Sequence, residues 1–409
     1  MKTDLKKKRI RTENISKRAQ NISVSLIKEM SMLADAVRGG GGSRIIPFGQ
    51  GVPYFDTPEY IKREIIESLQ QKDTRAYTLM PGINELRDLV ARRLEITHAI
   101  KKIDSRREVM ITVGCQEAIA CALSAVIDDG DEVILFTPGF ASHIQQVIHF
   151  GGKPKFATLK EIDNWAIDFV KLEKAVTKKT KAILFANPAN PTGKVLTVKE
   201  VKLLAAFAKK HDLFIISDET YDFLTYDGIP YFSPASLPGV RNRIIVCGSF
   251  SKKYALTGYR IGYAFAEQGI TSQMMKVHDA LVICSPAISQ KAAIAALKNS
   301  PASEKSTAEF VKGFSENRER ICARLDNLGN FFSYQKPMGA YYIFVKYDYP
   351  KLDSRQMAQK ILNDIHVVVI PGSAFGPTGE NHLRFSFGGT PEDIDEGFNR
   401  LDKWVASLR

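Results

Sequence analysis

Short apolar runs alternate with longer amphipathic stretches from about residue 108 onward. Apolar runs of this length, bounded by polar or turn-forming residues, predict buried strands, and the periodic stretches between them predict helices. The predicted strands are 109–113, 132–136, 181–186, 213–217 and 244–247, and the predicted helices are 117–127, 142–150 and 198–211. Apolar strands separated by helices favour a mostly parallel sheet covered on both faces.

The C-terminal part has a different pattern. A predicted helix at 303–328 leads to strands at 340–345, 367–370 and 383–387 and helices at 355–365 and 391–408. We therefore expect an α/β fold: a three-layer sandwich with a mostly parallel sheet, plus a smaller α+β C-terminal domain. The expected division is 1–44 (basic arm, helix 22–37 and glycine linker), 45–300 (large domain) and 301–409 (small domain, with contributions from the N-terminal segment).

Composition narrows the class of protein. The chain has 409 residues, of which 44% are hydrophobic and 25% charged, as expected for a large soluble protein. No apolar stretch reaches the roughly 20 residues needed to span a bilayer, and the start lacks the apolar core of a secretory signal. The five cysteines are odd in number, and neither they nor the seven histidines show metal-ligand spacing. We expect a cytoplasmic protein with no metal site.

The net charge of +12 is unevenly distributed. The first twenty residues hold eight Lys or Arg and two acidic residues, so half of the excess lies in this arm. Such an arm could bind nucleic acid or an anionic membrane. A solvated terminus explains it more simply, and we expect neither partner.

A lysine-containing turn holds the strongest chemistry. Residues 248–262 read Gly-Ser-Phe-Ser-Lys-Lys-Tyr-Ala-Leu-Thr-Gly-Tyr-Arg-Ile-Gly and follow the predicted strand at 244–247. A lysine beside hydroxyl and guanidinium donors suits a Schiff base with pyridoxal 5′-phosphate (PLP), because the aldehyde needs an amine and the phosphate needs donors.

Two further motifs follow predicted strands. Residues 187–193 read Asn-Pro-Ala-Asn-Pro-Thr-Gly, and residues 217–221 read Ser-Asp-Glu-Thr-Tyr. Asp218, at a buried strand end, needs a partner. A protonated pyridine nitrogen would supply one, although Asp218 could instead cap the following turn. Ligands of parallel sheets bind beyond the carboxyl ends of the strands, where these motifs lie.

Together the motifs resemble the class I and II aminotransferases of fold type I, over roughly residues 40–405. The resemblance implies that Lys252 carries PLP as a Schiff base and that Asp218 pairs with the ring nitrogen. It also implies that Asn190 and Tyr221 bond the ring oxygen. Lys252, Asp218 and Tyr221 are thus the expected catalytic residues.

The resemblance also implies how the rest of the cofactor is bound. Cys115 and Gln116, in the strand-to-helix turn 112–118, would donate backbone or side-chain bonds to the phosphate, since a helix N-terminus favours anions. Ser249 and Arg260 would bind the same group. Phe140 would stack on the ring, unless it is a core residue. Tyr77, unless it is a plain surface tyrosine, would reach the phosphate of a neighbouring subunit, which implies a homodimer.

The substrate is expected to be held by Gly51, Asn190 and Arg384. In the resembling family an arginine at the position of Arg384 grips the α-carboxylate with two hydrogen bonds. A structural ion pair is the alternative role for this arginine. The loop near Gly51 departs from the family, because Val52 and Tyr54 stand where acidic residues are common.

These residues predict a PLP-dependent aminotransferase that moves an amino group between an α-amino acid and a 2-oxo acid with ping-pong kinetics. Two alternatives stay open. The same scaffold supports PLP-dependent lyases and related non-transaminating enzymes, and a PLP-sensing regulator could use the basic arm to bind DNA. The latter is the weaker alternative, since about 45 residues leave little room for a DNA-binding domain. The amino donor and the oxo-acid acceptor are not legible in the sequence.

Overall fold

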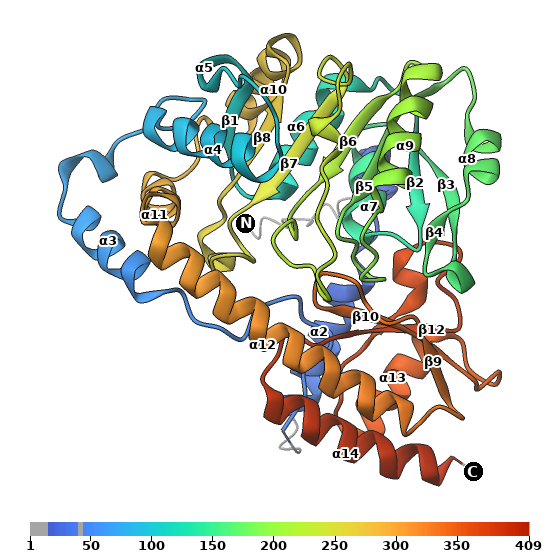
Figure 1. Cartoon of the computed structure of the whole chain (residues 1–409). Helices are drawn as coiled ribbons and strands as arrows, with labels where there is room; N and C mark the ends of the chain where they lie inside the picture. The colour runs from blue at the N-terminus through green and yellow to red at the C-terminus, as the bar shows by residue number, and fades with distance from the viewer. Residues whose placement is uncertain (1–14, 40–43, 409) are drawn as a thin grey trace, which may run out of the picture.

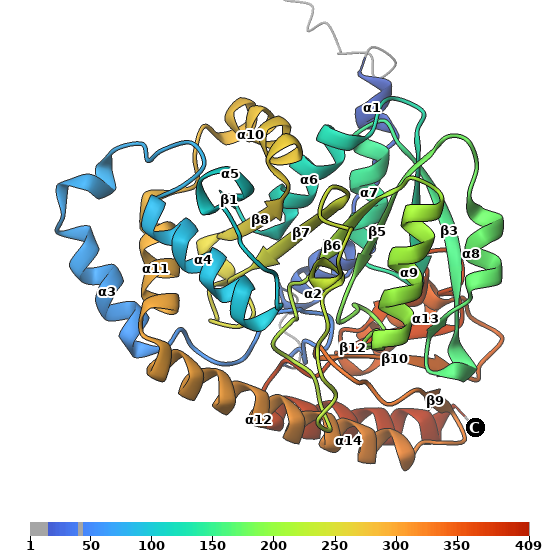
Figure 2. The ribbon, with the colours of Figure 1, turned by 45° about the horizontal axis from the view of Figure 1, so that its top comes forward.

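Two β-sheets organise the computed structural model, which describes residues 15–39 and 44–408 (Figure 1). An eight-stranded sheet occupies the upper part of Figure 1 and a four-stranded sheet the lower part. The long helix α12 (Ser300–Asp326) extends between the two regions (Figure 2). An α/β fold with a large, mostly parallel sheet and a smaller C-terminal sheet is therefore confirmed.

The large sheet has the order β1-β8-β7-β6-β5-β2-β3-β4. Neighbours among β3, β2, β5, β6 and β7 pair in parallel, whereas β8 is antiparallel to both β1 and β7, and β4 is antiparallel to β3 at the edge. Its strands are β1 (Val109–Thr112), β2 (Glu132–Thr137), β3 (Lys153–Lys160), β4 (Ala166–Ile167), β5 (Thr180–Ala186), β6 (Phe214–Asp218), β7 (Ile244–Ser249) and β8 (Gly262–Ala266).

Both faces of the large sheet are buried. Successive residues of β6 contribute to different cores, Ile215 to one and Ile216 to the other, because neighbouring side chains of a strand point to opposite faces. Helices α6 (Cys115–Val126), α7 (Ala141–His149) and α10 (Gln268–Val282) pack with one core, and α4 (Asn84–Thr97) and α9 (Val198–Lys210) with the other. The continuous apolar runs of the sequence reflect this double burial.

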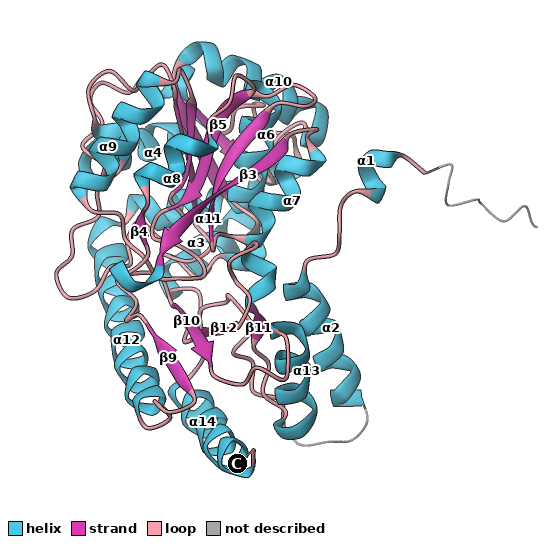
Figure 3. Cartoon of the chain, turned by 90° about the vertical axis from the view of Figure 1, so that its right-hand side faces the viewer, coloured by secondary structure: helices cyan, strands magenta, loops and turns pink. Residues whose placement is uncertain are grey.

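The small sheet is antiparallel throughout, with the order β11-β12-β10-β9. Its strands are β9 (Phe332–Tyr334), β10 (Tyr342–Tyr347), β11 (Ile370–Pro371) and β12 (His382–Ser386), and the helices around it include α13 (Ser354–Ile365) and α14 (Pro391–Ser407). The N-terminal segment joins this region, because Ile46 bridges Val367 and α2 (Leu26–Gly39) lies beside α13 (Figure 3). The remaining helices are α1 (Lys17–Gln20), α3 (Glu59–Leu69), α5 (Ser105–Glu108), α8 (Phe169–Ala175) and α11 (Ala287–Lys298).

Several elements differ from the sequence-based expectations. The strand expected at 367–370 is wrong over most of its length, because only Ile370–Pro371 pairs within the sheet and Val367 forms an isolated bridge. The helix expected from residue 22 begins at Leu26. Most of the basic arm (residues 1–14) and of the glycine run (residues 40–43) lie outside the described residues, and the domain boundaries stay a prediction.

The sheet topology brings the predicted motifs together. Ala186, Asp218 and Ser249 are the last residues of the neighbouring strands β5, β6 and β7. The loops that follow these strands lie at the junction with the small sheet, as the isolated bridge from Thr225 to Gly339 shows. The expected site therefore lies between the two sheets, at the carboxyl edge of the large one.

Candidate active site

A cavity of about 390 Å³ lies at this junction, within the size range of small-molecule sites. It brings together every site residue predicted from the sequence except Tyr77. The residues it gathers are Gly51, Cys115, Gln116, Phe140, Asn190, Asp218, Tyr221, Ser249, Lys252, Arg260 and Arg384.

Lys252 is the amine of this cavity. Its Nζ donates a hydrogen bond to the carbonyl oxygen of Gly51. Burial, followed by the nearby cations Arg260 and Arg384, lowers the pKa of Lys252 to about 8 against the opposing effect of Asp218. A lysine with this pKa is partly neutral near pH 7, and only the neutral amine is a nucleophile or a base.

The neighbouring Lys253 has a similarly lowered pKa of about 8, caused first by burial and then by Arg93. It lines a different hollow, against α12, and is absent from the cavity that holds Lys252. Position rather than acidity therefore separates the two lysines.

Asp218 presents a buried carboxylate to the cavity. Its Oδ1 accepts from the backbone N–H of Thr220 (3.1 Å) and from the thiol of Cys115 (3.3 Å), and its Oδ2 lies 3.2 Å from Nε2 of His143. Burial would raise the pKa of Asp218, but the hydrogen bonds and charge of His143 and the bonds from Thr220 outweigh it, and the net pKa is lowered. The carboxylate is therefore ionised and can hold a proton on a ligand atom facing it.

An anion-binding turn lies at the N-terminus of α6. Gly114 has a φ of +78° and precedes the first helical residue, Cys115. A Cβ on Gly114 would lie 2.7 Å from Nη2 of Arg260, so only glycine allows this guanidinium to approach the helix N-terminus. The free N–H groups, the helix dipole and the guanidinium together fit a phosphate.

The structure distinguishes the residues predicted for the phosphate. The Cys115 thiol donates to Asp218 (3.3 Å), and its role toward the phosphate stays a prediction. Gln116 accepts a hydrogen bond from Gln146 through Oε1 (2.9 Å). Ser249, which ends β7, accepts from the backbone of Ser251.

Arg384 is 2% exposed and lies on β12. It donates to Asn190 Oδ1 (3.1 Å) and to the carbonyl oxygen of Gly49 (2.6 Å), while its buried Nε has no hydrogen-bond partner. No carboxylate forms an ion pair with it among the described residues. A buried guanidinium without a counter-charge is costly, so this observation favours an anionic ligand over a structural ion pair.

A tyrosine cluster surrounds this arginine. The hydroxyl of Tyr221 lies 2.7 Å from that of Tyr342, and the ring of Tyr342 lies 4.6 Å from the Arg384 guanidinium carbon. Tyr341 donates to the carbonyl oxygen of Gly51 (2.9 Å). Gly51 has no room for a side chain, because a Cβ would collide with the Tyr342 hydroxyl. Burial raises the pKa of Tyr221, so its hydroxyl keeps its proton as a donor.

The remaining predicted residues lie as follows. Phe140 caps the start of α7, lines the cavity and contacts the His143 ring edge to face at 5.2 Å. Tyr77 lies outside the cavity, between α3 and α4, and is 80% exposed. A single chain leaves its predicted reach into a neighbouring subunit as a prediction.

Sequence reasoning missed several cavity residues. Tyr342 and Thr220 lie in elements that were expected, but nothing in the chain pattern distinguishes them from core or turn residues. His143 could have been suspected from its position three residues after Phe140, one helical turn along. Ser25, Ile27 and Lys28, from the N-terminal segment, also line the cavity, and their contribution has no local sequence pattern.

Other kinds of site find little support. The described part of the chain holds no group of three or more His, Cys, Asp or Glu placed to bind a metal ion. Within residues 15–39 and 44–408, no helix is both long and apolar enough to cross a lipid bilayer.

Comparison with known proteins agrees with this geometry. The family model described as aminotransferase class I and II matches residues 43–401. The aromatic-amino-acid aminotransferase 2 of Thermococcus litoralis is 36% identical over 95% of this chain and 97% of its own length, and the aspartate aminotransferase of Pyrococcus abyssi is 37% identical over 89% and 92%.

Solved structures give the same result. The chain superimposes on the aromatic aminotransferase of Pyrococcus horikoshii with a TM-score of 0.86 at 36% identity, covering 91% of this chain and 99% of that one. It superimposes on the aspartate aminotransferase of Thermus thermophilus with maleate with a TM-score of 0.89 at 28% identity, covering 95% and 99%.

Proposed function

The chain belongs to the class I and II aminotransferases and is an aminotransferase, and from that premise we propose that it binds PLP on Lys252 and moves amino groups between α-amino acids and 2-oxo acids. One observation carries the proposal most. The buried, uncompensated guanidinium of Arg384 shares a cavity with a lysine of pKa about 8 and an ionised, buried Asp218.

The residues present fit PLP, the cofactor that this family uses. Arg260, Ser249 and the N-terminus of α6 would hold its phosphate, and Asp218 its ring nitrogen. Asn190 and Tyr221 would bond its ring oxygen, and Phe140 would lie against its face. When bound, PLP supplies an aldehyde that condenses with amines and a protonated ring that draws electrons from the substrate.

The chain's own groups then have distinct tasks. Arg384 orients the α-carboxylate of the incoming amino acid through its planar guanidinium. Lys252 Nζ lies where it would serve as the general base for the proton on the substrate α-carbon. Asp218 keeps the ring nitrogen protonated, with His143 holding the carboxylate in place. A second substrate, a 2-oxo acid, would then accept the amino group that the first substrate left on the enzyme. This order of events gives ping-pong kinetics.

We further propose aromatic and acidic amino acids as candidate donors, because relatives named above act on aromatic amino acids and aspartate. The cavity offers groups for both. Phe140, Ile27 and Tyr342 present apolar surface, and Lys28 presents a cation. A half-reaction screen of the common amino acids, followed at the absorbance of the bound cofactor, ranks these donors directly.

The central test is covalent trapping. Borohydride treatment of the PLP-loaded protein should leave the cofactor on a peptide containing Lys252, and Lys252→Ala should lose both the trapped peptide and turnover. Trapping on Lys253 instead, or no trapping at all, contradicts the proposal. Turnover that continues only when a second oxo acid is supplied separates transamination from the lyase alternative, in which ammonia is released.

We also propose a homodimer in the cytoplasm. Tyr77 and Leu79 are exposed in the segment before α4, as is Leu69 at the end of α3, and such apolar exposure is typical of a covered surface. If Tyr77 reaches the partner's phosphate, mixing Tyr77→Phe and Lys252→Ala chains should give hybrid dimers with one complete site. The cysteines all lie in the described part of the chain and all have free thiols, as a reducing compartment favours.

A further inference from the structure

The turn after β6 presents side chains in two directions. Asp218 and Tyr221, three residues apart, line the cavity. Glu219 and Asp222 have the same spacing but do not line the cavity; their side chains are buried against the end of α4. The turn that would hold the cofactor is therefore anchored from behind by two carboxylates.

Glu219 is the more deeply buried of the two, with a fully buried side chain. Its Oε1 accepts from the hydroxyls of Ser217 (2.8 Å) and Ser233 (2.9 Å). Its Oε2 lies 2.9 Å from Nε2 of His98, an ion-pair distance at which the N–H is poorly aligned for a hydrogen bond.

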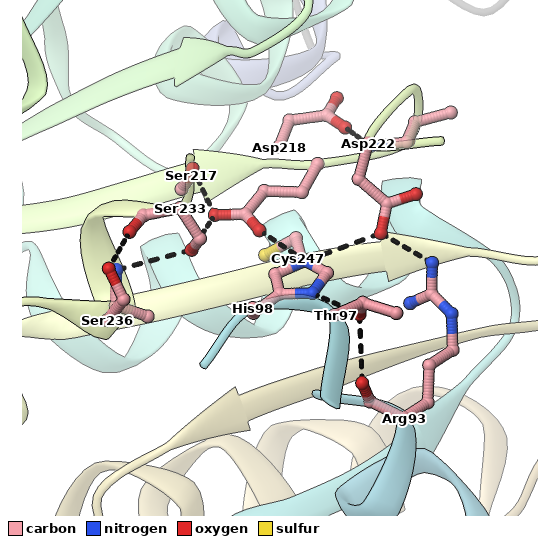
Figure 4. Close-up of polar contacts among 12 residues, drawn as sticks. Arg93, Thr97, His98, Ser217, Asp218, Asp222, Ser233, Ser236 and Cys247 are labelled. Carbon is pink, nitrogen blue, oxygen red and sulfur yellow. Dashed lines mark hydrogen bonds and ion pairs between the residues drawn. The ribbon is translucent and has the colours of Figure 1, made fainter. Parts of the chain in front are cut away.

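Asp222 shares His98 with Glu219 and also pairs with Arg93. Its Oδ2 lies 2.5 Å from Nη2 of Arg93 and 3.3 Å from Nε2 of His98 (Figure 4). Burial would raise the pKa of Asp222, but Arg93, His98 and Lys253 outweigh it and the net pKa is lowered. His98, the C-cap of α4, therefore contacts both carboxylates, and Arg93 of α4 contacts Asp222.

The contacts of His98 show which ring nitrogen faces which partner. The Thr97 hydroxyl has one proton, which it donates to the carbonyl oxygen of Arg93 (2.8 Å). Its oxygen must therefore accept from Nδ1 of His98, 2.6 Å away. Nε2 faces the carboxylates of Glu219 and Asp222, which only accept. Nδ1 of His98 is thus the donor to Thr97, and Nε2 is the ring nitrogen that lies against the two carboxylates.

Two tyrosines and one further lysine surround this network. Tyr263 accepts from Arg93 (2.7 Å), and the ring of Tyr231 contacts the His98 ring at 5.5 Å. Lys253, after β7, adds an ammonium that is partly neutral near pH 8. The buried Glu219 and Asp222 thus depend on Arg93 and His98, with Lys253 nearby, and removing one of these partners leaves a buried polar group without its contact.

We propose that His98 and Arg93 are positioning residues for the aminotransferase reaction: by contacting Glu219 and Asp222, they hold the turn that presents Asp218 and Tyr221 to the cofactor. This inference rests on the proposed PLP-dependent function. Neither residue lines the cavity, so both act through the turn rather than on the substrate.

The test compares His98→Gln with His149→Gln, the same substitution at an exposed histidine that ends α7. We expect His98→Gln to lower kcat on the order of tenfold to a hundredfold, because small displacements of catalytic groups are costly. The KM for the amino donor should change by no more than about twofold, since Arg384 is untouched. The visible circular dichroism of the bound cofactor should also change, because it reports the asymmetric setting of the ring.

The decisive comparison is between the single variant His98→Gln and a double variant that also changes its partner Glu219. In His98→Gln with Glu219→Gln, one buried anion again faces one buried cation, and the two amides can bond each other. We expect this double variant to recover kcat to within about threefold of wild type, as strong coupling between contacting residues predicts. The visible circular dichroism of the bound cofactor should also return to the wild-type spectrum in this double variant.

Each outcome of these measurements either supports or overturns the positioning role of His98. His98→Gln that matches His149→Gln in kcat and dichroism overturns the positioning role, as does a double variant no better than the single one. If His98→Gln fails to fold, the double variant still decides, because the proposal requires it to fold and turn over. Wild-type protein that cannot be trapped with PLP refutes the proposed function instead, so the two failures are distinguishable.

Discussion

Nη1 of Arg384 donates a hydrogen bond of 3.1 Å to the side-chain oxygen of Asn190, which joins the small sheet to the large one. Arg384 lies on β12, and Asn190 lies in the loop after β5. Because Nη2 of the same guanidinium bonds Gly49, three segments distant in sequence meet at one planar group. The proposed carboxylate grip is therefore fixed by both sheets and needs no ligand to form it.

Arg384→Lys should lower kcat/KM for amino donors on the order of a hundredfold, since each hydrogen bond to a charged group contributes about 1.5–3 kcal/mol. Lysine offers one point charge and cannot reproduce the planar pair of donors. Borohydride trapping of PLP should be unchanged. Arg320→Lys, at an exposed pair with Asp395, is the matched control and should behave as wild type. Equal losses in both variants would contradict the assignment.

Covalent capture of PLP by the cofactor-free protein should speed up with rising pH, with a midpoint near pH 8. The reason is that only the neutral amine of Lys252 reacts and its pKa is lowered to about 8. Stopped-flow absorbance across the pH range measures this midpoint. Lys253→Met should leave the profile in place, and a midpoint close to the ordinary lysine pKa of 10.5 would refute the lowered value.

The same shift affects folding with a definite sign. The folded pKa of Lys252 lies below the unfolded one, so the unfolded chain binds more protons between about pH 8 and 10.5. Burying the charged amine lowers the free energy of unfolding. This cost is present in full below about pH 8 and disappears as the pH rises to about 10.5. Lys252→Met should therefore stabilise the cofactor-free protein more at pH 7 than at pH 10, as chemical denaturation can show.

Gly114→Ala should weaken PLP binding more than it weakens folding. Gly114 has a φ of +78° and a ψ of 171°, a region essentially restricted to glycine, so alanine there costs about 1–3 kcal/mol, and its Cβ would displace Arg260. Gly130→Ala is the control, because Gly130 has a φ of +92° and nothing within 4 Å of the added Cβ. The two variants should melt at similar temperatures, while only Gly114→Ala raises the Kd for PLP. A matched rise in both would show that backbone strain alone is responsible.

Lys28→Gln should raise the KM for an acidic donor such as aspartate by no more than about fivefold, because exposed ion pairs are weak. The KM for phenylalanine should stay unchanged, since its side chain offers no partner for the ammonium. Lys17→Gln removes the same charge from α1, outside the cavity, and serves as the control. Steady-state kinetics with both donors measure the contrast, and an equal change for both donors would rule out recognition by Lys28.

Much of the large sheet was predictable, because strands buried on both faces appear as uninterrupted apolar runs. The strand β3 was missed because it contains several lysines and has no continuous apolar run. It lies next to the edge strand β4, and only part of it is buried. The strand β8 was missed because its glycine and alanines have weak strand propensity, and its reversed direction is set by neighbours distant in sequence.

The site residues also differ in whether the local sequence reveals them. Lys252, Asp218, Asn190 and Arg260 lie in motifs after strands, where local pattern and chemistry coincide. His98 could not be identified, because its importance comes from Glu219 and Asp222, which are over 120 positions away in the chain. Contacts of that kind are set by packing, and a single sequence carries no local trace of them.

Helix α2 has a practical consequence for protein engineering. The family match begins at residue 43, yet Ile27 and Lys28 lie upstream of it and line the cavity. A truncated chain starting at that boundary would keep Lys252 and Arg384 but lose one wall of the substrate entrance, together with the ion pair from Glu29 to Arg355. A chimera that exchanges only the matched residues 43–401 would therefore keep the recipient's own residues at positions 27 and 28 of the cavity lining.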